Sequence, residues 1–260
     1  MDSSARRHYL VHDFDSRKHL DDYFSGRPGM VFKDDYLVFP IENLMRTFTL
    51  GHIKGDILID LSGSSFIHHL YAACEFFKHI IVLKVKDRCI MELKRWVDTR
   101  TGAFDWCHVA KLHADIKGIS EQIEDKEGKV KSALQHVIKC NLGKENMTEP
   151  IDLPPADCII TALLLELICK DQDDYIKYIR KFSRLLKPGG HIILFGAVGG
   201  FYLTVGDHKL QVFNYDEEFA REALVAEGFV IDSFEVKNRS NVSDLLDYKG
   251  VIFIAAHKEK

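Results

Sequence analysis

The chain has 260 residues, of which 46% are hydrophobic and 28% charged, so it has the composition of a globular protein and the length of one large α/β domain. Its 35 Lys and Arg against 39 Asp and Glu give a formal charge of −4, which excludes a generally basic nucleic-acid-binding surface. The polar start of the sequence lacks an apolar signal segment, and its apolar stretches are too short to span a bilayer. Six cysteines show no C-x-x-C spacing. We therefore expect a cytoplasmic protein with reduced thiols and without nucleic-acid or membrane partners.

Apolar periodicity predicts helices and buried strands in the first half of the chain. In chain order these are residues 21–24 (helix), 41–50 (helix), 57–61 (strand), 66–77 (helix), 79–83 (strand), 88–97 (helix) and 120–139 (helix, irregular at Gly128). Residues 1–54 contain no strong strand pattern, so we expect them to form a helical cap over the rest of the chain.

In the second half, proline and glycine mark where elements begin and end. The predicted elements are residues 157–164 (strand), 175–186 (helix), 191–197 (strand), 217–227 (helix), 229–236 (strand) and 251–257 (strand). Lys187-Pro188-Gly189-Gly190 predicts a turn that ends a helix.

This alternation of strands and helices is typical of βαβ units and predicts a doubly wound, mostly parallel α/β sheet. The last two strands lack a helical spacer, so we expect them to pair antiparallel. The sequence contains no repeat or linker. It therefore predicts a single domain, 1–260, with a helical cap (1–54) and a Rossmann-like core (55–260).

In such a sheet, ligands bind beyond the carboxyl ends of the strands. The loop after the first strand, Asp60-Leu61-Ser62-Gly63-Ser64-Ser65, has one glycine, which suits either a nucleotide-binding loop or an ordinary βα turn. After the second strand, Val85 offers no acceptor to a ribose, and we expect Asp87 to lie in the first turn of the next helix.

The remaining polar residues give few catalytic candidates. His68 and His69 are adjacent, so on a helix they point about 100° apart and cannot chelate one metal ion together. Glu166 lies in an apolar run, where it is either a buried carboxyl with a raised pKa or a strand-end group in water. Spacing selects no catalytic triad and no metal site.

Five segments carry a resemblance to one family: residues 56–61, Ala73-Cys74-Glu75, Ala103-Phe104-Asp105-Trp106, Pro154-Pro155-Ala156-Asp157-Cys158 and Leu185-Leu186-Lys187-Pro188-Gly189-Gly190. Together they resemble the nicotinamide, phenylethanolamine and indolethylamine (thioether) N-methyltransferases from about Tyr9 to the C-terminus. The nicotinamide and indolethylamine enzymes are the most similar. Lys-Pro-Gly-Gly occurs in many methyltransferases, whereas the Phe-Asp-Trp and Pro-Pro-Ala-Asp-Cys segments are specific to this family.

The resemblance implies a class I methyltransferase fold, S-adenosyl-L-methionine as cofactor, and a small amine or pyridine whose nitrogen attacks the sulfonium methyl in line. The cofactor-binding positions that it implies are Phe24, Ser62, Gly63, Ser64, His68, Val85, Lys86, Ile90, Asn141, Leu142 and Ala162. Most differ from the family pattern: Ser62 and Ser64 replace glycines, and Val85 replaces the ribose-binding aspartate.

The implied substrate pocket consists of His19, Tyr23, Leu163, Glu166, Gly196, Tyr202 and Leu203. Tyr23 and Tyr202 match the family, whereas His19 replaces a stacking tyrosine and Gly196 the substrate-anchoring aspartate. Losing a charged acceptor costs about 1.5–3 kcal/mol. The side chains of Ser62 and Ser64 crowd the ligand and add to this cost. A total loss of roughly 4–6 kcal/mol in binding free energy turns a micromolar ligand into a millimolar or weaker one.

These departures leave three hypotheses. The first is a family member with an intact fold but a dismantled cofactor site, which is catalytically impaired or repurposed and retains space for a small-molecule ligand. The second is an active S-adenosylmethionine-dependent N-methyltransferase with a rearranged site, in which Asp60, Asp87 or Asn141 reaches the nucleoside. The third is an interaction module that uses the charged region 117–147. We expect a monomer.

Overall fold

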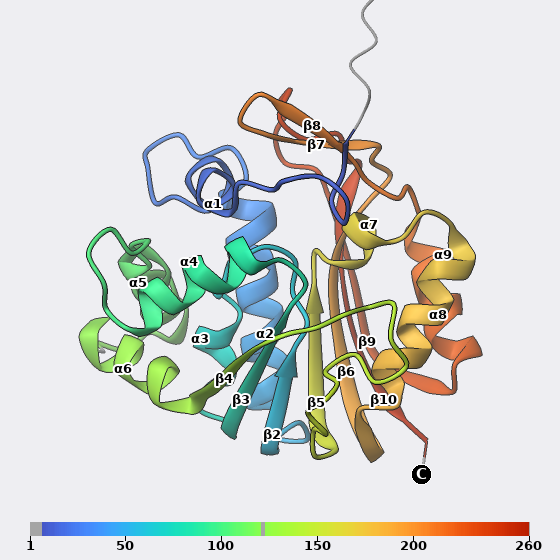
Figure 1. Cartoon of the computed structure of the whole chain (residues 1–260). Coiled ribbons are helices and arrows are strands. Elements are labelled where there is room, and N and C mark those ends of the chain that lie inside the picture. Colours follow the sequence, from blue (N-terminus) through green and yellow to red (C-terminus); the bar gives the residue numbers. More distant parts are fainter. Residues whose placement is uncertain (1–6, 121–122, 260) are drawn as a thin grey trace, which may run out of the picture.

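The computed structural model describes residues 7–120 and 123–259 (Figure 1). At its centre is a seven-stranded sheet in the order β4-β3-β2-β5-β6-β10-β9. In chain order its strands are β2 (Gly55–Asp60), β3 (Phe77–Lys84), β4 (Leu134–Lys139), β5 (Ala156–Ala162), β6 (Leu186–Val198), β9 (Phe229–Asn238) and β10 (Gly250–Lys258). Strands β2 to β6 pair in parallel, and β10 lies antiparallel between β6 and β9. The doubly wound, mostly parallel sheet and its antiparallel last strand are confirmed.

Helices surround this sheet, and a small second sheet lies at its upper end. The helices are α1 (Ser16–Tyr23), the π-helical segment η1 (Lys33–Val38), α2 (Phe39–Thr49), α3 (Leu70–Ala73), α4 (Asp87–Val97), α5 (Cys107–Lys117), α6 (Ile123–Ala133), α7 (Leu165–Ile168), α8 (Gln172–Ser183) and α9 (Glu217–Ala226). The small sheet joins β1 (Arg7–His8), β8 (His208–Gln211) and β7 (Tyr202–Val205). In Figure 1, α1, α7 and the β7–β8 hairpin gather at one end of the large sheet.

Local chemistry accounts for several element boundaries. Asp15, Asp171 and Asp216 are the N-caps of α1, α8 and α9, where each side chain accepts a hydrogen bond from a backbone N–H of the first turn. Gly118 ends α5 in the left-handed conformation, with φ +67°. In the described ranges, no helix is long and apolar enough to cross a membrane.

Two expected helices are corrected. Of residues 66–77, only Leu70–Ala73 are α-helical, and β3 already begins at Phe77. Every residue of the segment 62–69 is buried. Its apolar residues therefore do not mark one buried face of an amphipathic helix. The charged segment 120–139 contains α6 and then β4, an edge strand whose exposed polar residues resemble a helical pattern.

The Lys187-Pro188-Gly189-Gly190 segment also differs from expectation. Helix α8 already ends at Ser183, and residues 187–190 form an irregularity inside β6. Ala156 pairs with Leu186 and Cys158 with His191, so the segment loops out of the ladder between these pairs. The sequence analysis missed η1, α5 and the β7–β8 hairpin.

Candidate functional site

The direction of chain crossover reverses between β2 and β5, which places the expected ligand site of this sheet at their carboxyl ends. We call the loops that follow β2, β3, β4 and β5, together with α1 above them, the carboxyl edge. It contains many of the positions implied for the cofactor.

The loop after β2 packs directly against the loop after β5. Gly63 N–H donates to the Ala162 carbonyl at 2.9 Å, and a Cβ added to Gly63 would lie 2.2 Å from the Leu163 carbonyl oxygen. The expected left-handed conformation occurs at Ser64 (φ 53°), and Leu163 also adopts it (φ 48°). Each such non-glycine residue costs about 1–2 kcal/mol. The only glycine of this loop is therefore needed for the close contact between the loops after β2 and β5.

Lys84, the last residue of β3, places its ammonium group inside the carboxyl edge. The side chain is 1% exposed, and Nζ donates to Ser62 Oγ at 2.6 Å and to the Ser62 carbonyl at 3.1 Å. It also forms an ion pair with Asp60 Oδ2 at 3.4 Å. A buried lysine is tolerated only when it is paired in this way.

Asp60, at the end of β2, is the anion that balances this lysine. It is fully buried and accepts hydrogen bonds from Ser62 Oγ at 2.9 Å and from His69 Nε2 at 2.8 Å. Burial by itself raises the pKa of this carboxyl, but the Lys84 charge, His69 and the hydrogen bonds outweigh it and lower the pKa to about 2. Asp60 is therefore ionised.

The residues at the end of β3 point in different directions. Side chains alternate along a strand, and it is Lys84 rather than Val85 that reaches the loop after β2. Val85 and Lys86 instead line a separate hollow of about 460 Å³ beside α4, and Lys86 Nζ donates to the Leu10 carbonyl at 3.0 Å. Ile90 is half-buried on α4.

An aromatic cluster fills the space below α1. Phe24, Phe66 and His68 are each 0% exposed, and their ring centroids lie 4.8–5.3 Å apart. Burial lowers the pKa of His68 well below its ordinary value, and within the described ranges neither of its ring nitrogens has a hydrogen-bond partner. His68 thus packs as a neutral ring, and His19 stacks on Tyr23 beside the cluster with centroids 4.8 Å apart.

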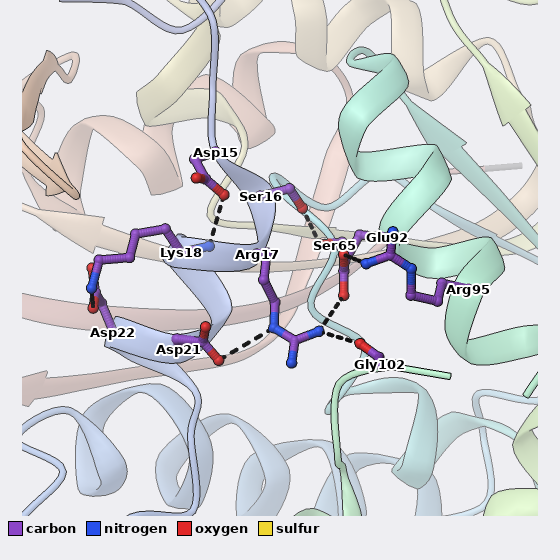
Figure 2. A network of polar contacts seen from close by, with 10 residues as sticks. All are labelled: Asp15, Ser16, Arg17, Lys18, Asp21, Asp22, Ser65, Glu92, Arg95 and Gly102. Atoms are coloured by element: carbon purple, nitrogen blue, oxygen red, sulfur yellow. Dashed lines mark hydrogen bonds and ion pairs between the residues drawn. The ribbon is translucent and has the colours of Figure 1, made fainter. Parts of the chain in front are cut away.

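Helix α1 is fastened over the loop after β2 (Figure 2). The Ser16 hydroxyl forms a hydrogen bond with the Ser65 hydroxyl, and His19 Nδ1 lies 2.9 Å from Ser64 Oγ. Arg17 extends from the same helix to Glu92 of α4 at 3.0 Å and to the Gly102 carbonyl at 2.6 Å. These contacts hold the cap against the carboxyl edge.

Three of the positions implied for the cofactor, Asn141, Leu142 and Ala162, lie in the loop after β4 and at the end of β5. Asn141 is exposed, and its Oδ1 accepts a hydrogen bond from Gly143 N–H at 2.9 Å, so it stabilises its own turn. Leu142 and Ala162 are buried, at 4% and 1% exposure.

The expected substrate positions do converge, but on a small cavity of about 30 Å³. Those lining it are His19, Tyr23, Leu163, Glu166 and Leu203. Gly196 lies beneath Tyr215, whose hydroxyl would be 2.2 Å from an added Cβ. Tyr202 is half-buried, with Lys209 Nζ 4.2 Å from its ring centroid. Ligand pockets usually measure roughly 300–1,000 Å³, whereas this cavity has room for about one water molecule.

Glu166 is the perturbed acid of this cavity. Burial raises its pKa to about 7, although the backbone N–H of Ala197 donates to Oε1 at 2.8 Å and opposes the shift. Of the two alternatives left by the sequence, the buried carboxyl is correct.

The sequence matches the profile of the NNMT/PNMT/TEMT family over residues 3–259. The chain belongs to this family. Human nicotinamide N-methyltransferase is 32% identical over 250 residues, which cover 96% of this chain and 94% of that protein. Indolethylamine N-methyltransferase of Oryctolagus cuniculus is 31% identical over 254 residues, covering 98% and 95%.

Solved structures agree on the fold of this NNMT/PNMT/TEMT family member. The Burkholderia thailandensis 1,6-didemethyltoxoflavin-N1-methyltransferase, determined with its substrate and S-adenosylhomocysteine, matches with a TM-score of 0.53 at 14% identity. The match covers 94% of this chain and 87% of that one. The fold is that of class I S-adenosylmethionine-dependent methyltransferases, and S-adenosylmethionine is the cofactor of that group.

Proposed function

We propose that this chain is a family member whose cofactor and substrate sites have been closed by its own side chains, so that it is catalytically impaired or repurposed. The observation that carries the proposal is the buried Lys84 ammonium, bonded to Ser62 and paired with Asp60. In a doubly wound sheet a ligand is expected at this edge, and S-adenosylmethionine is the cofactor of methyltransferases with this fold. The residues present there do not fit it.

The chemistry of Lys84 opposes that cofactor in two ways. A ribose hydroxyl donates to a carboxylate, but an ammonium group offers only donors. The Lys84–Asp60 pair is neutral as a whole, so the negative charge of Asp60 is not available to the cationic sulfonium of S-adenosylmethionine. The polar groups of Ser62 and Ser64 are also engaged, by Lys84 and by His19.

Moving Lys84 aside to admit a ligand at the carboxyl edge costs free energy, and this cost reduces the affinity for that ligand. Withdrawing Lys84 leaves Asp60 as a buried charge without its ion-pair partner, which costs about 3–5 kcal/mol. At about 1.4 kcal/mol for each tenfold change, affinity falls by roughly two to four powers of ten. A micromolar cofactor site becomes a millimolar one before any contact with the ligand is counted.

Calorimetric titration of the full chain with S-adenosylmethionine and with S-adenosylhomocysteine tests the proposal. We expect no saturable binding at micromolar concentrations and no rise in melting temperature, whereas human nicotinamide N-methyltransferase serves as the positive control. Micromolar binding of either compound contradicts the proposal.

The alternative, an active N-methyltransferase with a rearranged site, rests on Glu166, an acid with a pKa of about 7 in a cavity beside Tyr23 and His19. A radiolabelled methyl-transfer assay over pyridines, tryptamines and thioethers separates the two. We expect no transfer to any of them, and transfer to one would favour the alternative.

We infer a cytoplasmic location, supported by six cysteines that are all free thiols. We also infer a monomer, which sedimentation at several concentrations would test. Among the positions that the family resemblance implies, a small-molecule ligand would have to expand the cavity at Glu166 or use the hollow beside Val85.

A further inference from the structure

Three side chains with metal-binding atoms lie across β6, β10 and β9, far along these strands from the carboxyl edge. They are His191, His257 and Asp232, whose candidate ligand atoms all lie within 4.8 Å of one another. None belongs to the positions that the family resemblance assigns. All three are half-buried or exposed, so solvent ions can reach them.

The sheet register brings these side chains together. His191 and His257 are directly opposite partners of the antiparallel β6–β10 ladder, so their side chains leave the same face, with ring centroids 5.9 Å apart. In the β9–β10 ladder, Ala255 pairs with Ser233 and Ala256 with Ile231, which leaves Asp232 as the extra residue of a bulge.

The bulge explains how the aspartate joins the two histidines. An extra residue in one strand redirects the side chains around it, and bulges are frequent beside functional sites. Asp232 Oδ1 lies 2.8 Å from His257 Nδ1, so the carboxylate reaches the imidazole pair while it remains exposed to solvent.

The electrostatic environment suits ligands that must be deprotonated. Burial lowers the pKa of His191, and His257 and His52 act in the same direction, while Asp232 opposes them. Metal ions bind the neutral form of an imidazole.

We propose that His191, Asp232 and His257 form a binding site for a late first-row divalent cation, represented by Zn²⁺, which links the last three strands of the sheet. Two imidazoles and one carboxylate are a common zinc ligand set, with water in the fourth position. In a tetrahedral site the ligand atoms lie about 3.4 Å apart, so side-chain rotations alone bring the present donors into place. The ion replaces the proton between His257 Nδ1 and Asp232.

Titration of the chelator-treated full chain with ZnCl₂ tests this site. We expect one equivalent to bind and the melting temperature to rise. His191→Gln, Asp232→Asn and His257→Gln should each weaken binding by more than tenfold, because each removes one of three protein ligands. His208→Gln is the matched control, since His208 is an exposed strand histidine outside the cluster, and it should bind as the wild type does.

Melting curves in the presence of chelator establish that each variant is folded. Co²⁺ binding to the wild-type chain gives a second readout that needs no variant, because a four-coordinate site produces intense visible absorption bands. Failure of the wild type to bind Zn²⁺ or Co²⁺, or equal binding by the cluster variants and the wild type, overturns the proposal.

Discussion

Replacing Lys84 with methionine removes the buried ammonium while keeping a long, unbranched side chain in the same space. Asp60 then loses its ion-pair partner and keeps the hydrogen bonds from Ser62 and His69. Truncating one partner of a buried ion pair costs about 3–5 kcal/mol because the other charge stays buried. We expect Lys84→Met to lower the free energy of unfolding by that amount at neutral pH.

The loss should depend on pH, and the sign follows from Asp60. In the wild type its pKa of about 2 lies below the ordinary 3.8, so its stabilising contribution is present above pH 3.8 and disappears as the pH falls through about 2. Without Lys84, burial becomes the dominant influence and raises the pKa of Asp60 above 3.8. The variant should therefore lose further stability as the pH rises from about 4 towards neutrality, where Asp60 becomes a poorly paired charge.

Urea unfolding followed by circular dichroism at several pH values between 4 and 8 measures both effects. Lys78→Met is the matched control, because Lys78 lies on the same strand and pairs with Asp56 at 2.6 Å, but this pair is exposed to solvent. We expect little change for the control. A loss for Lys84→Met no larger than for Lys78→Met, or one that is the same at every pH, would refute the assignment of Lys84 and Asp60 as a buried ion pair.

Two further substitutions test the neighbouring loops. Gly63→Ala should destabilise the fold by about 1–3 kcal/mol or more in urea unfolding, because the new Cβ would lie 2.2 Å from the Leu163 carbonyl oxygen; unchanged stability would contradict this packing. Burial disfavours the charged form of Glu166 and raises its pKa, so the wild type should lose stability as the pH rises from 4.5 to about 7. Glu166→Gln should abolish this loss. At pH 8 the variant should be more stable than the wild type by at most about 3 kcal/mol. Parallel profiles of unfolding free energy against pH for the two proteins would contradict this prediction.

The fold was predictable wherever a strand is buried on both faces. Runs such as 57–61 and 251–257 are apolar apart from Asp60 and His257. The edge strand β4 was missed because only one of its six residues is fully buried. The charged region 117–147 was expected either as a solvated face or as an interaction surface; two of its lysines, Lys117 and Lys126, bind Glu75 within the fold.

The candidate site was predictable by segment but not by residue. The resemblance identified the end of the second strand as important, but neighbouring residues there point to opposite sides, and the sequence does not say whether Lys84 or Val85 points inward. One available signal was a lysine at the end of an otherwise apolar run, which is rarely buried without a partner. The contact between Asp60 and His69 was not predicted because it depends on the path of the loop between them.

Under the proposed function, the pairing of Lys84 with Asp60 links the stability of this chain to the loss of a ligand site. A lysine at the end of β3 could not remain buried without an anion, and Asp60 at the end of the adjacent β2 supplies one. The same ion pair removes a carboxylate that a bound nucleoside could otherwise use and fixes Ser62 across the loop. Any ligand that binds here must displace a hydrogen bond and an ion pair that already stabilise the fold. The more these interactions stabilise the ligand-free protein, the lower its affinity for the ligand.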